Sequence, residues 1–316
     1  MKFDIKINKL SNLYLFISEL SQWNELICVP SRKKEWLKQT NYLNPKEKQA
    51  LKEFSQIFIQ ASGNPELTFL SEQDKNIWPK ITKQIGSKQT QKLKEIFKLF
   101  ENKFQKIWPS KKEKLAKISK HIKNKQKQID KKILLICQLC HVKPQSLPAK
   151  LDLFLFMNSS TEEAQGWSYQ DKIILECSDW PFKKINYLIH CILLHETFHF
   201  IIKKNKKIFN LILNSSSQIK KYLPADLKKW DPKIILEDLL ISSFLPEGYL
   251  TEKFCKINIK KEAKQELKKK NIDNFTKLRN FCALHMYELA KEYTEKEKSL
   301  NENYLEELIE CIKKAE

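Results

Sequence analysis

His195, Glu196 and His199 are the residues of this chain best suited to chemistry. They form the pattern His-Glu-x-x-His inside an apolar segment with the periodicity of a helix. Residues four apart share one face of a helix, so both imidazoles can reach one zinc ion. Glu196 then points beside the ion, where a general base for a zinc-activated water is needed. The alternative interpretation is a core helix whose two histidines are satisfied by hydrogen bonds.

The segment before the motif contains the signals of a helix start. Ser178 or Asp179 can cap the helix, and Pro181 suits its first turn. The positions that supply its apolar spacing are Ile185, Leu188, Ile192 and Phe198. Two strands are expected upstream, at 151–157 and 172–177, because their residues are apolar and alternate. Gly248, one of only four glycines, suggests a close backbone approach near the motif.

The order strand, loop, strand and motif helix resembles the zincin metallopeptidases, over about a third of the chain. The resemblance implies a zinc ion with an open position for water, and a strand that lines the cleft and pairs with an extended peptide. The segment 158–177 matches that strand. The metzincin continuation with a third histidine is absent, since Phe200-Ile-Ile-Lys-Lys follows the motif. A downstream acid as third ligand would make the chain similar to the gluzincins, the thermolysin-like group.

Glu237 and Asp238 are the candidates for that third ligand. Asp231-Pro232 opens a helix that is expected to continue to Leu245. Within it, after Asp231, they are the only acids, and apolar residues surround them. Buried carboxylates are costly unless they are paired or bind a metal. We expect Glu237 to be the ligand, with Asp238 as the alternative, either as ligand or as the partner of a histidine N–H. The acid that the family usually carries four residues beyond the glutamate is replaced by Ile241.

Two further residues are candidates for transition-state contacts. Tyr249 could donate a hydrogen bond to a developing oxyanion, or pack as an ordinary loop aromatic. His285 is a candidate by analogy with zincins that bring such groups from a C-terminal lobe, and its alternative is a satisfied core histidine.

Composition predicts a mainly helical α+β fold. Lysine, leucine, isoleucine and glutamate dominate, and 41% of the residues are hydrophobic, which indicates a globular chain rather than a disordered one. We expect three regions: a helical N-terminal lobe at 1–145, a zincin-like catalytic core with a small sheet at 146–250, and a helical C-terminal region at 251–316 packed on the core.

The charge of +20 suggests nucleic acid or an anionic membrane as a partner. However, Arg32 and Arg279 are the only arginines among 58 basic residues. Guanidinium is the preferred group for contacts to phosphate and guanine, so a nucleic-acid partner is not expected. The densest lysine run, 111–132, is interpreted as a solvated helix face rather than a binding helix.

No export signal or membrane span is expected, because Lys2, Asp4, Lys6 and Lys9 interrupt the N-terminus. The protein is therefore expected to be cytoplasmic, with its eight cysteines as buried free thiols. Cys137-x-x-Cys140-His141 matches the pattern for haem attachment, but it continues an apolar helical run and is interpreted as core.

The sequence thus predicts a zinc-dependent peptide hydrolase. His195, His199 and Glu237 would hold zinc, and Glu196 would act as general base. The alternatives are a lysine-rich helical binding protein without a catalytic metal, and an inactive zincin-like fold retained as an interaction module. The pattern indicates neither a particular peptide nor an oligomeric state.

Overall fold

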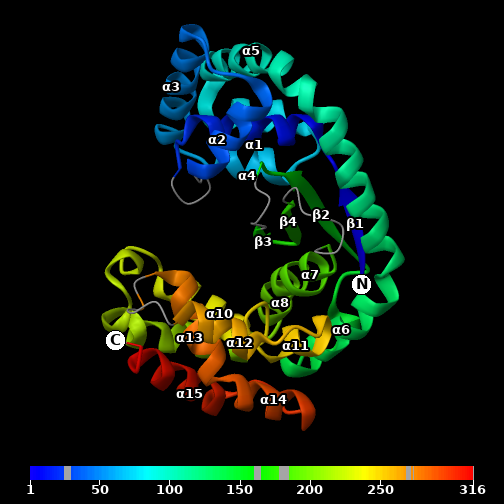
Figure 1. Ribbon diagram of the computed structural model, residues 1–316, viewed down its shortest axis with the longest axis vertical. Coiled ribbons are helices and arrows are strands. Elements are labelled where there is room, and N and C mark those ends of the chain that lie inside the picture. Colours follow the sequence, from blue (N-terminus) through cyan, green and yellow to red (C-terminus); the bar gives the residue numbers. More distant parts are fainter. Residues whose placement is uncertain (25–29, 160–164, 178–184, 268–271, 273, 316) are drawn as a thin grey trace. The chain divides into compact units, whose positions relative to one another are not determined.

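The computed structural model describes all residues except 25–29, 160–164, 178–184, 268–271, 273 and 316 (Figure 1). The chain divides into two compact units. The sheet unit comprises residues 2–124 and 150–185, and the motif unit comprises Met1 with residues 125–149 and 186–316. Each unit therefore combines segments that are far apart in the sequence.

A four-stranded sheet organises the sheet unit. Its strands are β1 (Lys2–Lys6), β2 (Lys150–Met157), β3 (Gln165–Tyr169) and β4 (Lys172–Cys177). Their spatial order is β1-β2-β4-β3, with β2 parallel to both β1 and β4 and with β3 antiparallel to β4. Residues 153–157 of the strand β2 are a continuous apolar run, and all five are buried, because both faces of the strand are covered there. The expected strands at 151–157 and 172–177 are confirmed.

Five helices complete the sheet unit: α1 (Lys9–Ser21), α2 (Pro30–Thr40), α3 (Pro45–Ile59), α4 (Pro65–Ser71) and α5 (Asp74–Asn124). Helices α1, α4 and α5 contact the sheet. Asn12 of α1 hydrogen-bonds to the backbone of β2 at both Leu155 and Met157. Helix α3 starts at a capping box of Asn44 and Glu47. Aromatic rings that include stacked Tyr14 and Phe69 fill the space between these helices.

Helix α5 differs from the prediction. The Trp-Pro pairs at 78–79 and 108–109 predict two helix starts, and Ser110 a helix cap, but both prolines lie inside α5. The interruption is instead at Gly86, whose φ of 80° and ψ of 164° are not helical. In the lysine run, Lys112, Lys117 and Lys120 are exposed as expected. Lys111 is buried, with its ammonium 5.3 Å from the centre of the Trp36 ring.

The motif unit is helical. A continuous helical stretch carries the motif: α7 (Ile185–Tyr187), a π-helical segment (Leu188–Leu193) and α8 (Leu194–Ile202). The other helices are α6 (Gln126–Leu139), α9 (Lys206–Ser215), α10 (Pro232–Ser242), α11 (Tyr249–Cys255), α12 (Ile259–Leu267), α13 (Phe275–His285), α14 (Tyr287–Glu295) and α15 (Glu302–Lys313). Helix α8 contacts α6 and α10, and α10 contacts α13 (Figure 1). These contacts place α10 and α13 around the motif.

The chain is mainly helical with a small mixed sheet, as the sequence predicts. The boundaries of the two units differ from those of the three predicted regions. Residues 146–250 do not form one body, because the strands from 150 to 177 belong to the sheet unit and the motif helix belongs to the motif unit. The physical reason is the parallel pairing of β1 with β2, which joins the N-terminal segment to the strands.

Two other expectations concern the chain as a whole. Among the described residues, one stretch, Ile185–Ile202, is long and apolar enough to cross a membrane by length and composition, and 76% of it is buried within the protein. A core helix of a soluble protein passes the same test. The described cysteines are free thiols and all but Cys255 are buried, which confirms the core interpretation of Cys137 and Cys140. Cys28 lies outside the described residues.

Candidate metal centre

The two motif histidines lie on one face of α8. His195 and His199 are four residues apart, and their Nε2 atoms are 3.1 Å apart. The π-helical segment at Leu188–Leu193 comes immediately before this turn, and such segments often occur at functional sites. The predicted cap residues Ser178 and Asp179 and the predicted first-turn Pro181 lie outside the described residues.

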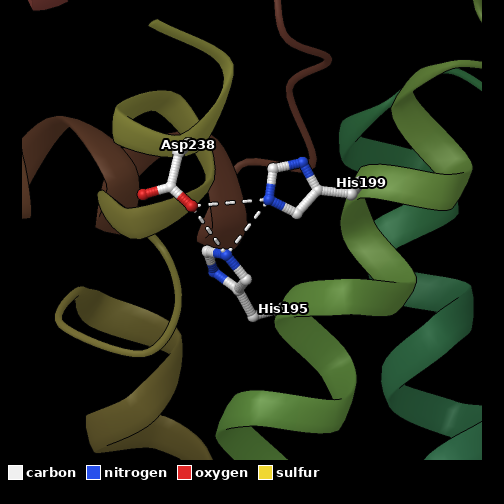
Figure 2. A group of neighbouring side chains, drawn as sticks. All are labelled: His195, His199 and Asp238. Carbon is white, nitrogen blue, oxygen red and sulfur yellow. Dashed lines mark hydrogen bonds and ion pairs between the residues drawn. The ribbon is translucent and has the colours of Figure 1, made fainter. Parts of the chain in front are cut away.

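Helix α10 brings a carboxylate to the same point. Asp231 caps this helix by accepting a hydrogen bond from the Lys233 amide, and Pro232 occupies its first position, as the sequence predicts. The Oδ1 atom of Asp238 lies 3.1 Å from His195 Nε2 and 3.5 Å from His199 Nε2. Figure 2 shows the three side chains pointing at one another. Their ligand atoms all lie within 4.8 Å of each other, close enough to bind one metal ion.

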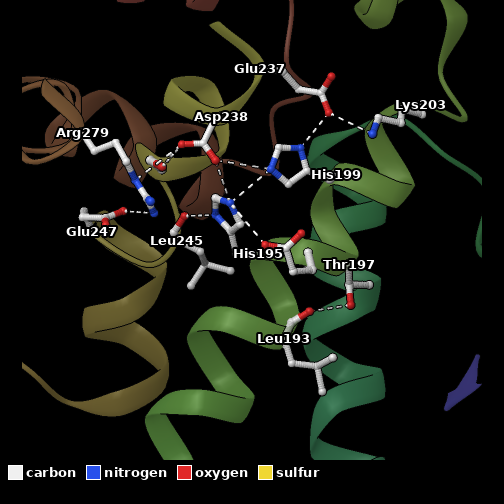
Figure 3. Close-up of polar contacts among 12 residues, drawn as sticks. Leu193, His195, Thr197, His199, Lys203, Glu237, Asp238, Leu245, Glu247 and Arg279 are labelled. Carbon is white, nitrogen blue, oxygen red and sulfur yellow. Dashed lines mark hydrogen bonds and ion pairs between the residues drawn. The ribbon is translucent and has the colours of Figure 1, made fainter. Parts of the chain in front are cut away.

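The other ring nitrogen of each histidine already has a partner. His195 Nδ1 lies 2.7 Å from the backbone carbonyl oxygen of Leu245, and His199 Nδ1 lies 2.7 Å from Glu237 Oε1 (Figure 3). A carbonyl and a carboxylate only accept hydrogen bonds, so each Nδ1 must carry the proton. In a neutral imidazole, Nε2 is then left with a lone pair. This is the arrangement in which metal-binding histidines are held.

Gly248 permits the turn that follows α10 and contains Leu245. A Cβ atom at position 248 would lie 1.8 Å from the carbonyl oxygen of Ser243, so no other residue fits without moving the backbone. The close approach expected from the sequence is confirmed.

Three electron-pair donors therefore converge: two Nε2 atoms and Asp238 Oδ1. Atoms of this kind repel one another unless a cation lies among them. Without a metal, that cation can only be a proton. Burial alone would lower the pKa of His199, but its hydrogen bonds to Asp238 and Glu237 prevail and raise the pKa to about 9. A proton on His199 or a metal ion among the three atoms would each relieve this repulsion.

Glu237, the residue expected to bind the metal, lies elsewhere. It contacts His199 Nδ1, on the side of the ring away from Nε2, and Lys203 Nζ at 3.5 Å. Neighbouring residues of a helix point about 100° apart, so only one of two adjacent acids can face the histidine Nε2 atoms. The geometry thus favours the alternative assignment, with Asp238 in the ligand position and Glu237 as the partner of a histidine N–H.

Glu196 lies beside the three donors, as the motif predicts. It is buried, and its Oε1 atom is 4.0 Å from His195 Nε2. Burial raises the pKa of Glu196 above its ordinary value, although the positive charge available on the two histidines reduces the effect. A carboxylate with a raised pKa is suited to accept a proton and return it.

Arg279 and Glu247 complete the site, and our reading of the sequence did not single out either of them for this role. The Nε atom of Arg279, from α13, lies 3.5 Å from Asp238 Oδ2, and its Nη2 lies 3.0 Å from Glu247 Oε2. Burial would raise the pKa of Asp238, but Arg279 and the bonds to the histidines hold it well below its usual value. The scarcity of arginine in the chain was the signal that could have identified Arg279.

The formal charges around the site do not cancel. Among the described residues, four carboxylates, those of Glu196, Glu237, Asp238 and Glu247, are paired with two cationic side chains, Lys203 and Arg279. With neutral histidines the formal charge of this group is minus two, which one divalent cation would neutralise.

Tyr249 and His285 have other partners. The Tyr249 hydroxyl donates a hydrogen bond to Glu295 at 2.6 Å, and its ring packs edge-on against Tyr287. His285 is exposed, and its Nδ1 lies 2.9 Å from the carbonyl oxygen of Phe281. It follows Arg279 by six residues, about one and two-thirds helical turns, and so points away from the face that Arg279 uses. Neither contact brings these residues to the three converging donors.

Comparisons with known proteins return no matching family model, no matching curated protein and no matching solved structure. The function of the site is therefore argued from its residues alone.

Proposed function

We propose that the protein is a zinc-dependent peptide hydrolase whose metal is held by His195, His199 and Asp238. The carrying observation is the convergence of two histidine Nε2 atoms and one carboxylate oxygen, with both Nδ1 atoms engaged elsewhere. Two nitrogen ligands and one oxygen ligand suit zinc, and three protein ligands are typical of a catalytic site rather than a structural one. With both histidines neutral, the formal charge of minus two equals the charge that one divalent ion would neutralise, which supports a metal of that charge.

When bound, zinc supplies Lewis acidity, which polarises a peptide carbonyl and makes a water molecule more acidic. The protein residues supply the rest. Glu196 accepts a proton from the attacking water and delivers it to the leaving amine, for which its raised pKa is suited. Glu237 and the Leu245 carbonyl fix the tautomer and direction of the two imidazoles.

Two imidazoles and one carboxylate are also the donor set of non-haem iron sites. Glu196 favours hydrolysis over that chemistry, because a buried carboxylate next to the first histidine provides the base that hydrolysis needs.

Replacement of Glu196 tests the proposed reaction. Glu196→Gln keeps the size of the side chain but removes the base, so zinc content and fold should be retained while peptide hydrolysis falls by at least about a hundredfold. Glu306→Gln, on an exposed position of α15, is the matched control and should leave turnover unchanged. Elemental analysis and a broad peptide library provide the two measurements.

The outcomes separate the proposal from its rivals. Equal turnover in the Glu196→Gln variant would exclude this mechanism. A wild-type protein that holds zinc but cleaves no peptide favours an inactive interaction module. A wild-type protein that binds no metal favours a helical binding protein.

A further inference from the structure

The only two arginines of this lysine-rich chain have the same kind of surroundings. Arg32 contacts Glu19 and Glu176 in the sheet unit, and Arg279 contacts Asp238 and Glu247 in the motif unit. Each guanidinium thus lies against two carboxylates. A guanidinium directs several N–H groups in fixed directions, whereas a lysine ammonium is a point charge on a flexible stem. The use of arginine at these two positions indicates a need for fixed geometry.

At Asp238 the two carboxylate oxygens have separate partners. Oδ1 faces the two histidines, at 3.1 Å from His195 Nε2 and 3.5 Å from His199 Nε2. Oδ2 faces Arg279 Nε at 3.5 Å and the Ser242 hydroxyl at 3.5 Å. Figure 3 shows Arg279 on the side of Asp238 away from the histidines. The contact with Arg279 therefore sets which oxygen points at the metal position.

Glu247 holds Arg279 in turn. Its Oε2 accepts a hydrogen bond from Arg279 Nη2 at 3.0 Å, and both side chains are largely shielded from solvent. Because Glu247 offsets the charge of the guanidinium, Arg279 can sit behind the ligand without adding a net positive charge to a site for a cation.

We propose that Arg279 is the positioning residue of the metal centre: it engages Asp238 Oδ2 and so presents Oδ1 alone to the metal as a one-oxygen ligand. This inference rests on the proposed function, because it assumes that Asp238 binds the metal. It adds two supporting contacts: Glu247, in the turn after α10, holds Arg279 of α13, and Arg279 holds the ligand Asp238.

The direction in which zinc affinity changes when Arg279 is replaced distinguishes an orienting role of this residue from a purely electrostatic one. Removing a positive charge next to a metal site would, by charge alone, strengthen binding of a cation. Removing a group that orients a ligand weakens binding, typically by about 10–100-fold. A fall in zinc affinity on loss of Arg279 therefore reports its positioning role.

The test compares zinc affinity in wild type, Arg279→Lys and Arg279→Met by competition with a chromophoric chelator. We expect Arg279→Met to bind zinc about 10–100-fold more weakly, and Arg279→Lys to lie between it and wild type. Lys264→Met, which removes an exposed lysine of α12, is the control and should bind zinc as wild type does. The absorption spectrum of the cobalt-substituted protein should change in Arg279→Met, because the ligand set around the ion is altered.

The same substitution made in a protein that already carries Asp238→Asn shows whether Arg279 acts through Asp238. In Asp238→Asn protein, the further change Arg279→Met should have no additional effect on zinc affinity. Circular dichroism establishes which variants fold. If Arg279→Met does not fold, Arg279→Lys and Glu247→Gln provide the test, with weaker zinc binding and an altered cobalt spectrum expected in both.

Three results would overturn the inference. One is unchanged or tighter zinc binding in folded Arg279→Met. Another is wild-type affinity together with a wild-type cobalt spectrum in both Arg279→Lys and Glu247→Gln. The third is an undiminished effect of Arg279→Met in the Asp238→Asn background. A wild-type protein that binds no zinc overturns the proposed function as well, and that result is distinguishable because it precedes any variant.

Discussion

Each unit of this protein buries one cluster of charged side chains built around an arginine, and the two clusters are completed differently. In the sheet unit, Arg32 Nη1 lies 2.9 Å from Glu19 Oε1 and 2.6 Å from Glu176 Oε2, so the guanidinium itself lies between the acids. In the motif unit, Arg279 contacts Glu247 and the outer oxygen of Asp238 but not the inner one. The inner oxygen and two histidine nitrogens face one another, and no lysine or arginine among the described residues is paired with that oxygen.

The difference separates a structural cluster from a candidate ligand site. The charges of the cluster around Arg32 are paired within the chain, and the Trp36 indole also donates to Glu19 while the Arg32 carbonyl accepts from Ser159. Buried charges of this kind are compatible with a stable fold only when each has its oppositely charged partner. In the cluster around Asp238, the outer oxygen of Asp238 and both histidine Nδ1 atoms have partners, while the inner atoms are turned toward a common point. These three inner atoms are the ones that could hold a metal ion.

Loss of Arg32 should have the largest effect on stability. Arg32→Met removes the cation from between Glu19 and Glu176 and leaves buried acid groups without their partner, so the free energy of unfolding should fall by about 3–5 kcal/mol. Urea denaturation, monitored by tryptophan fluorescence, measures this free energy. Lys34→Met, at an exposed position of α2, is the control. A fall no larger than that of the control would mean that the cluster is not structural.

The second prediction compares two adjacent acids of α10. Asp238→Asn weakens a ligand, so zinc affinity should fall by more than about 100-fold, whereas Glu237→Gln removes a partner of His199 and should cost about 10–100-fold at most. Chelator competition measures both. The reverse order of effects would restore Glu237 as the ligand, as the sequence alone suggests.

The third prediction concerns pH, and the two clusters should respond in opposite directions. Burial, aided by the charge of Glu176, raises the pKa of Glu19 to about 8 from an ordinary 4.5. A raised pKa gives stability that is fully present below about pH 4.5 and is lost as the pH rises through about 8. Zinc binding at the other cluster should instead strengthen as pH rises, because its histidines must lose their protons.

Urea denaturation between pH 5 and pH 8 tests the stability half of this prediction. Wild type should lose at least about 1 kcal/mol over that range, and Glu19→Gln, which cannot ionise, should lose less. Parallel curves for the two proteins would show that Glu19 does not titrate in this window.

The helices that carry the site could be predicted from the sequence, but the way in which they pack against one another could not. His195, Glu196 and His199 could be placed because one helix fixes their relation, and α10 could be placed from Asp231 and Pro232. The choice between Glu237 and Asp238 could not be made, because it depends on the rotation of α10 about its own axis. That rotation is set by packing against other helices, which no local pattern encodes.

The division into units could not be predicted for a related reason. Strand β1 pairs with β2 across almost half the chain, and a parallel pairing at that separation leaves no local signal beyond the strands themselves. Arg279 was visible as one of two arginines, but its partner Asp238 lies on another helix, and only the tertiary structure brings them together.

Metal content tests the central claim most directly. Wild-type protein, equilibrated with zinc and separated from the excess, should retain one zinc per chain by elemental analysis, and Asp238→Asn should retain much less. Haem absorbance should be absent, because Cys137 and Cys140 are buried in the core. A wild-type protein that retains no divalent metal would contradict the account, since a proton on His199 would then be the only cation that these three groups hold.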